Sequence, residues 1–93
     1  MNSKRKFEKN PNLESDPNEG GNYSLFLEND DVHDFVYVID ALIEVCDHDL
    51  VQAEQCTYLV HYKGGCEVKN GKYEQLKEMF NRLLDKGLTV SIN

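Results

Sequence analysis

Residues 25–39 read LFLENDDVHDFVYVI, and the character of the chain changes twice within this stretch. Leu25 to Leu27 is an apolar run of strand length, whereas the residues from Phe35 onward are apolar at helical spacing. Between them lie an amide, an imidazole and several carboxylates. A polar cluster anchored at both ends by core elements is held in place, which suits a recognition site. The alternative is a solvated strand-to-helix turn in which Asp34 caps the helix.

The flanking sequence predicts an α+β domain with the element order β-α-α-β-α-β. We expect a small antiparallel three-stranded sheet that packs against three helices. Apolar spacing and turn residues predict strands at 23–28, 66–69 and 88–92, and helices at 35–46, 49–63 and 73–86. Asp49 and Gln52 resemble a capping box, Asn70-Gly71 reads as a turn, and Gly87 as the residue after the third helix. The second helix is predicted to pack inward through Leu50, Ala53, Cys56, Leu59 and Val60.

Length and composition indicate one folded domain preceded by an extension. The chain has 93 residues, of which 40% are hydrophobic and 29% charged. This is enough for a single core and too little for two. Residues 1–22 are rich in Asn, Pro, Gly and charge, so we expect a disordered N-terminal extension, with the folded domain at 23–93.

The charge distribution predicts a negative field over part of the domain. The net charge is -7, which argues against nucleic-acid binding, because phosphate neutralisation needs clustered Lys and Arg. No Lys or Arg occurs between Lys9 and Lys63, whereas acidic residues are frequent between 28 and 54. Such a region attracts cationic groups, although it is often only a solvated face. No segment has the length of a membrane span or the pattern of a signal peptide, so we expect a cytoplasmic protein.

The three cysteines predict buried thiols. Cys46, Cys56 and Cys66 are odd in number, ten residues apart, and form no C-x-x-C pair. This spacing argues against a disulfide framework or a structural zinc site. Cys46 and Cys56 also fall on apolar helix faces, which disfavours a Cys-His hydrolase. A metal site drawn from Asp30, Asp31, His33 and His48 has no recognised ligand spacing, so neither a metal nor another cofactor is expected.

Two short motifs, taken together, resemble a known family. Asn29-Asp30-Asp31 follows the first strand, and Val60-His61-Tyr62-Lys63-Gly64 closes the second helix, where Thr57, Val60 and His61 share one face. By itself, His61 reads as a satisfied core or rim histidine. The pair of motifs, in this order, resembles the ClpS family, the adaptors of Clp proteases. The resemblance continues through Val38-Ile39-Asp40, Ala53, Cys66 and the last strand, and spans residues 23–93 except near the second strand, where this chain is a few residues shorter.

The resemblance implies a monomeric adaptor rather than an enzyme. ClpS proteins bind substrates whose first residue is bulky and hydrophobic (Leu, Phe, Tyr or Trp) and deliver them to the N-terminal domain of a ClpA- or ClpC-like AAA+ unfoldase. By position, Asn29 and His61 would hydrogen-bond the substrate α-amino group, with Asp30 and Asp31 in support. The hydrophobic pocket would be lined by His33, Phe35, Thr57, Val60 and Leu88. Glu74 and Lys77 would lie on the surface that docks on the unfoldase.

Departures from the family pattern keep one alternative open. Phe35 and Thr57 each stand where a Met is common, and His33-Asp34 where Thr-Pro is common. These changes affect the shape of the pocket rather than the amine contacts. The alternative is a protein-interaction module of the same fold that docks on a Clp unfoldase without selecting N-terminal residues.

Overall fold

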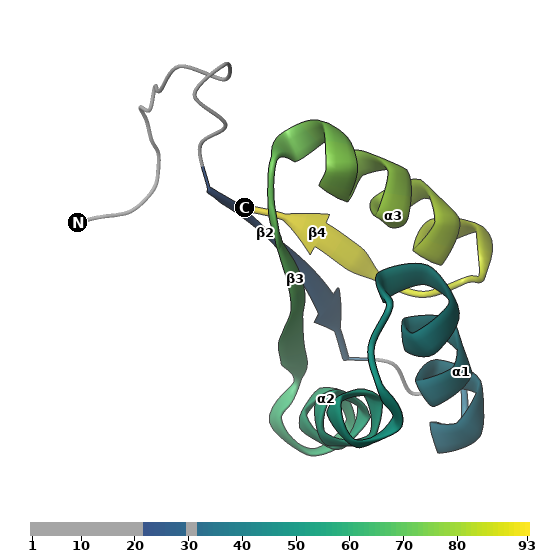
Figure 1. Cartoon of the computed structure of the whole chain (residues 1–93). Coiled ribbons are helices and arrows are strands. Elements are labelled where there is room, and N and C mark those ends of the chain that lie inside the picture. Colours follow the sequence, from purple (N-terminus) through teal and green to yellow (C-terminus); the bar gives the residue numbers. More distant parts are fainter. Residues whose placement is uncertain (1–21, 30–31) are drawn as a thin grey trace.

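The computed structural model describes residues 22–29 and 32–93 (Figure 1). Its elements, in chain order, are β2 (Tyr23–Glu28), α1 (Phe35–Cys46), α2 (Leu50–Lys63), β3 (Gly65–Gly71), α3 (Tyr73–Asp85) and β4 (Val90–Ile92). The predicted α+β class and the order β-α-α-β-α-β are confirmed. The predicted extension lies outside the described residues, apart from Asn22. No helix in the described ranges is long and apolar enough to cross a bilayer.

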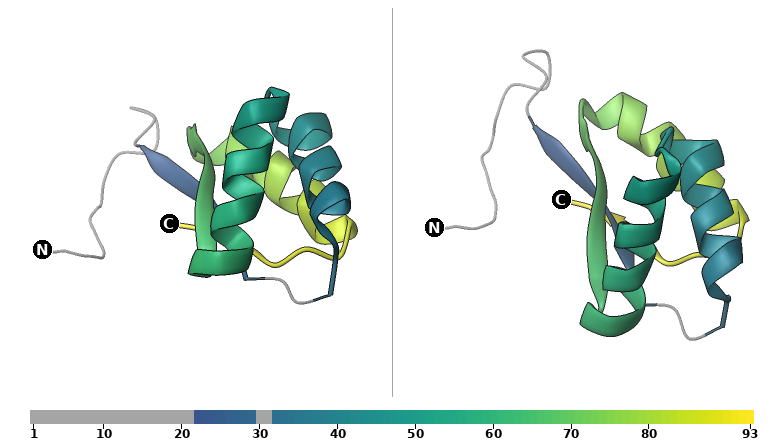
Figure 2. Two further views of the ribbon diagram at one scale, coloured as in Figure 1. Left: turned by 90° about the horizontal axis from the view of Figure 1, so that it is seen from below. Right: turned by 60° about the horizontal axis from the view of Figure 1, so that its bottom comes forward.

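The three strands form one antiparallel sheet with β2 in the centre. The strand order is β3-β2-β4, and Leu27 pairs with Cys66 on one side and with Val90 on the other. A bulge interrupts the register between Leu25 and Phe26. Side chains alternate along a strand, so Leu25 and Leu27 are buried while Phe26 is only half-buried. Figures 1 and 2 show the helices gathered on one side of the sheet.

The core lies between this sheet face and the helices. Its buried apolar members come from every element: Leu25, Leu27, Val38, Ala41, Leu42, Val45, Cys46, Ala53, Cys56, Val60, Val68, Leu76, Leu83, Leu88 and Val90. Two predicted caps fix where the helices begin. The carboxylate of Asp34 accepts the Tyr37 N–H at 2.9 Å, and that of Asp49 accepts the Gln52 N–H at 2.7 Å. These bonds satisfy amides that the first helical turn leaves without intrahelical partners.

The last two strands differ from their predicted bounds. β3 continues through Asn70 and Gly71, which pair with β2 instead of forming a turn. β4 begins only at Val90, because the residues before it complete the end of α3. Gly87 has a left-handed φ of 84°, and the Leu88 N–H donates to the Leu83 carbonyl at 3.2 Å. This cap turns the Leu88 side chain into the core beside α3.

Helix α2 carries apolar residues on both its inner and its outer face. The predicted inward positions Ala53, Cys56 and Val60 are buried, but Leu50 and Leu59 are exposed, so that part of the prediction was wrong. Thr57 takes an inner position instead, and its hydroxyl donates to the Ala53 carbonyl at 2.7 Å. That bond satisfies the polar group and leaves the Thr57 methyl for packing.

The cysteine prediction was wrong for two of the three residues. Cys56 of α2 and Cys66 of β3 form a disulfide, with their Cα atoms 5.6 Å apart. Sequence separation did not reveal the pair, because only the return of β3 alongside α2 brings the two Cα atoms within bonding range. Cys46 is a buried free thiol, as predicted. Burial raises the pKa of the Cys46 thiol to about 11, so it stays protonated at neutral pH.

Candidate functional site

The candidate site lies where the end of β2, the start of α1 and the last turn of α2 meet. The pairing of β2 with β3 shows where the end of β2 lies. Glu28 pairs with Gly65, which follows α2 after a single residue, Gly64. Asn29, the exposed residue after β2, therefore lies at the end of the sheet where α2 also ends. The two sequence motifs, about thirty residues apart in the chain, thus converge on one end of the sheet.

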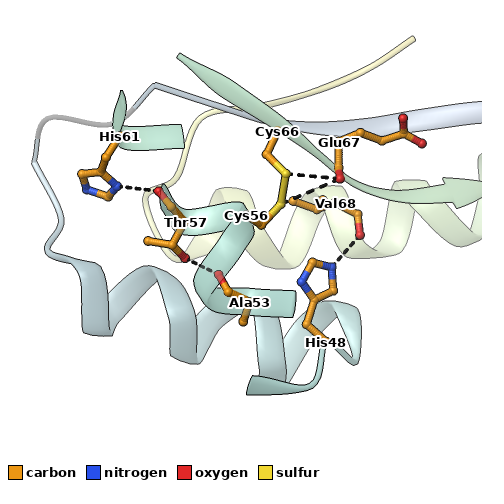
Figure 3. The surroundings of a disulfide bond; sticks show 8 residues. All are labelled: His48, Ala53, Cys56, Thr57, His61, Cys66, Glu67 and Val68. Carbon is orange, nitrogen blue, oxygen red and sulfur yellow. Dashed lines mark hydrogen bonds between the residues drawn. A yellow bond between two sulfur atoms is a disulfide. The ribbon is translucent and has the colours of Figure 1, made fainter. Parts of the chain in front are cut away.

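His61 bridges two of these elements through its two ring nitrogens. Its Nδ1 lies 3.0 Å from the carbonyl oxygen of Thr57, one turn earlier in α2 (Figure 3). Its Nε2 lies 3.3 Å from the carbonyl oxygen of His33, in the segment before α1. His61 is only partly buried.

The protonation state of His61 decides what these contacts mean. A neutral imidazole carries one N–H, so only one nitrogen donates to a carbonyl. We assign that proton to Nδ1, which makes the shorter contact, and this assignment leaves Nε2 as an acceptor. Two acceptors, Nε2 and the His33 carbonyl oxygen, then face each other at 3.3 Å. One external donor, such as an ammonium group, could reach both atoms.

Aromatic rings surround this pair of acceptors. The Phe35 ring lies 4.7 Å from the His61 ring and 6.3 Å from the Tyr62 ring, measured between centroids. On the other side, the His33 ring stacks on Tyr37 at 4.6 Å. The rings supply an apolar rim around a polar centre, which is the usual composition of a small ligand site.

A glycine lets the His33 ring approach the turn after α3. A Cβ added at Gly87 would come within 3.4 Å of two atoms of the His33 imidazole. The same turn is fixed to α1 by the Tyr37 hydroxyl, which donates to the Lys86 carbonyl at 2.7 Å. The start of α1 is therefore attached to the segment that carries Leu88.

Three of the five predicted pocket residues are fully covered. Thr57, Val60 and Leu88 are each at most 2% exposed, whereas His33 and Phe35 are half-buried. That these five side chains form one pocket stays a prediction. A hollow of about 430 Å³ lies elsewhere, on the outer face of α2, and is lined by Glu54, Gln55, Tyr58 and Leu59.

The structure does not test the roles predicted for the remaining site residues. Asp30 and Asp31 lie outside the described residues, so their support of the amine site stays a prediction. Glu74 and Lys77 are exposed on the first turns of α3. The ammonium of Lys77 lies 5.5 Å from the centre of the Phe80 ring. Their docking role also stays a prediction.

Sequence reasoning missed two features of the site. One is the backbone carbonyl of His33, which no side-chain pattern reveals. The other is the disulfide from Cys56, the residue before Thr57. A buried histidine, His48, lies apart from the site, with its Nε2 2.7 Å from the Val68 carbonyl. Across residues 22–29 and 32–93, no group of three or more His, Cys, Asp or Glu residues gathers as a metal site would.

Comparison with known families agrees with the motifs and the fold. The family described as ATP-dependent Clp protease adaptor protein ClpS matches residues 18–91. Among curated proteins, no sequence matches this chain. The family match covers the folded domain from β2 into β4 and includes both motifs. This chain therefore belongs to the ClpS family of Clp protease adaptors.

Proposed function

We propose that this adaptor binds substrates through a free N-terminal residue that is bulky and hydrophobic, and delivers them to a Clp AAA+ unfoldase in the cytoplasm. One observation carries the proposal. His61 Nε2 lies 3.3 Å from the His33 carbonyl oxygen, so an ammonium group placed there could donate to both atoms. The family match supplies the adaptor role, and the acceptor pair supplies the ligand chemistry.

The α-amino group of a peptide suits these acceptors in its charge and in its number of hydrogen-bond donors. Its pKa is about 8, so at neutral pH it is mostly an ammonium with three donors. Asn29, exposed at the same end of the sheet, offers an amide oxygen as a third acceptor. Hydrogen bonds to a charged group contribute about 1.5–3 kcal/mol each. An acetylated N-terminus has neither the charge nor the donors, so it should be rejected.

The side chain of the substrate's first residue makes the second set of contacts by which the substrate is recognised. We place it between the half-buried rings of His33 and Phe35, over Thr57, Val60 and Leu88. Burial of a Leu or Phe side chain contributes about 1.5–3 kcal/mol. Because association has a large entropic cost, neither this term nor the amine contacts would suffice alone. Short or charged first residues should therefore bind poorly.

Docking on the unfoldase requires a second surface. Glu74 and Lys77 are exposed on α3, which packs at the β4 side of the sheet, away from α2 (Figure 1). This separation supports an adaptor that holds its substrate and its unfoldase at the same time. The partner would be the N-terminal domain of a ClpA- or ClpC-like unfoldase. The competing function is docking without N-terminal selectivity, favoured by Phe35 if its ring closes the pocket.

A panel of peptides separates the two functions. Fluorescence anisotropy is measured with peptides that differ only in their first residue: Leu, Phe, Tyr, Trp, Ile and Met. The adaptor function predicts saturable binding of Leu and Phe peptides and weaker binding of the others in an order set by pocket shape. Docking without selectivity predicts no binding, or equal binding to all.

Phe35→Met is expected to widen the set of accepted first residues. Phe35 is larger and stiffer than Met, and its ring lies 4.7 Å from His61 at the rim. We expect the substitution to raise affinity for Trp and Ile peptides at least about threefold relative to Leu, because a flexible thioether makes room. Phe26→Met, half-buried on the opposite face of the sheet, is the matched control. Unchanged ratios in the Phe35 variant would place its ring outside the pocket.

A further inference from the structure

The Cys56–Cys66 disulfide encloses the α2 part of the proposed site. It joins the middle of α2 to the start of β3 (Figure 3). The loop that it closes, residues 57–65, contains every α2 residue to which the proposed function assigns a role. The helix ends inside this loop, at Gly64, whose φ of 96° reverses the chain. The covalent link therefore holds both ends of the segment that presents His61.

We propose that this disulfide is a reversible redox site that sets the affinity of the amine site, with tight binding in the disulfide form and weaker binding in the dithiol form. The inference rests on the proposed function for its effect on binding. The redox chemistry and its effect on α2 do not depend on that function. The reductant is a dithiol, and the oxidant is a disulfide of the same class.

One of the two sulfur atoms is placed for attack. Cys56 is buried in the core at 4% exposure, whereas Cys66 is only partly buried. Cys66 belongs to β3, an edge strand of the sheet, so no further strand covers it on that side. A thiolate from solvent can therefore reach the Cys66 sulfur more readily than that of Cys56.

The exchange balances without any other reactant. The thiolate of the dithiol attacks Cys66 Sγ, forms a mixed disulfide there, and releases Cys56 as a thiolate that takes a proton. The second thiol of the reductant then attacks the reductant's other sulfur, the one bonded to Cys66 in the mixed disulfide. Cys66 leaves as a thiolate, which also takes up a proton. Two electrons and two protons pass to the protein, and the dithiol becomes a disulfide. Oxidation follows the same steps in reverse.

The surroundings accommodate both redox states. The carbonyl oxygen of Glu67 lies 3.8 Å from Cys56 Sγ and 3.4 Å from Cys66 Sγ (Figure 3). Disulfide sulfur atoms carry no hydrogen, so in the oxidised protein these are contacts only. After reduction, each thiol finds the same carbonyl within reach as an acceptor. The dithiol form is therefore not left with buried groups that lack a partner, which keeps the exchange reversible.

Reduction acts on binding through the position of His61. Its acceptor nitrogen is aimed by two backbone carbonyls, one in α2 at Thr57 and one before α1 at His33. Thr57 adjoins Cys56 in the chain, so the disulfide fixes the turn of helix that orients the imidazole. Without the link, the end of α2 is held only by non-covalent packing against α1 and β3. A site that is less preorganised binds more weakly because binding must then order it.

The test compares the oxidised and reduced full-length protein in two measurements. Anisotropy with a Leu peptide reports affinity, and hydrogen exchange reports the protection of the backbone amides at residues 60–64. Dithiothreitol is the reductant, and mass after alkylation at neutral pH counts the accessible thiols. Cys46 should not be labelled while the protein is folded, because burial raises the pKa of its thiol to about 11. Cys46→Ala keeps the pair, and the double variant Cys56→Ser with Cys66→Ser removes it.

We expect reduction to weaken peptide binding about threefold to tenfold and to speed exchange at 60–64, in both wild type and Cys46→Ala. The double variant should have the affinity and the exchange rates of the reduced protein, and dithiothreitol should change neither. Equal affinity and equal exchange in the two states would overturn the proposal, as would failure of a dithiol to reduce the folded protein. If exchange responds to reduction but no peptide binds in either state, the redox effect on α2 stands and the proposed function fails.

Discussion

Replacing His61 with alanine is expected to weaken binding of a Leu peptide about 10- to 100-fold. The estimate follows from the loss of one hydrogen bond to a charged group, about 1.5–3 kcal/mol, at about tenfold per 1.4 kcal/mol. His61 holds the acceptor nitrogen that faces the His33 carbonyl at 3.3 Å. It is only partly buried, so truncation should change binding far more than stability. Anisotropy titration measures the affinity, and thermal unfolding checks the fold.

A matched control lies on the same helix. Gln55 is exposed on the outer face of α2, so Gln55→Ala removes a polar side chain without touching the candidate site. Its affinity should stay within about twofold of wild type. Should the two variants bind alike, His61 would be a structural residue of the helix end and the amine would be held elsewhere.

Reduction of the Cys56–Cys66 disulfide is expected to lower the melting temperature by at least about 10 °C. Cross-linking of residues ten apart removes conformational entropy from the unfolded chain, worth about 3 kcal/mol in the chain-entropy account. In a domain of this size, 1 kcal/mol corresponds to about 4–8 °C. Calorimetry of the oxidised and reduced protein measures the shift.

The serine double variant separates the cross-link from side effects of the reductant. Cys56→Ser with Cys66→Ser should melt near the reduced protein, with or without dithiothreitol. Cys46→Ala alone should keep the redox difference, because Cys46 is a free thiol outside the pair. A melting temperature that does not respond to reduction in wild type would mean that the cross-link does not constrain the unfolded chain as supposed.

The sequence predicted the fold closely because its local signals agree with one another. Asp34 and Asp49 precede apolar residues at helical spacing, and both cap helices where predicted. The apolar run from Leu25 to Leu27 was correctly predicted to lie in the first strand. These signals act over a few residues, so they can be read without knowing the tertiary structure.

The errors come from contacts between distant residues. Cys66 joins Cys56 only because β3 returns along α2, which spacing alone cannot show. Leu59 was expected in the core, but Thr57 takes the inner position once its hydroxyl bonds to a helix carbonyl. Leu88 was expected in a strand, but its N–H donates to the Leu83 carbonyl, so Leu88 belongs to the cap at the end of α3.

The candidate site was predictable only in part. The side chain of His61 was identified from the motif that contains it. Its partner, the backbone carbonyl of His33, leaves no trace in the sequence and emerges only from the way the start of α1 lies beside α2. The geometry therefore adds a reason for amine recognition that the motif resemblance did not contain.

The most direct test of amine recognition compares two peptides that differ only at the α-amino group. Both begin with Leu, and one is acetylated, so the side chain offered to the pocket is the same. Anisotropy titration of the oxidised protein at pH 7.5 is expected to give saturable binding of the free peptide and at least about 100-fold weaker binding of the acetylated one, because two charge-assisted hydrogen bonds are lost. Equal affinity for the two peptides, or no binding of the free one, would contradict the account.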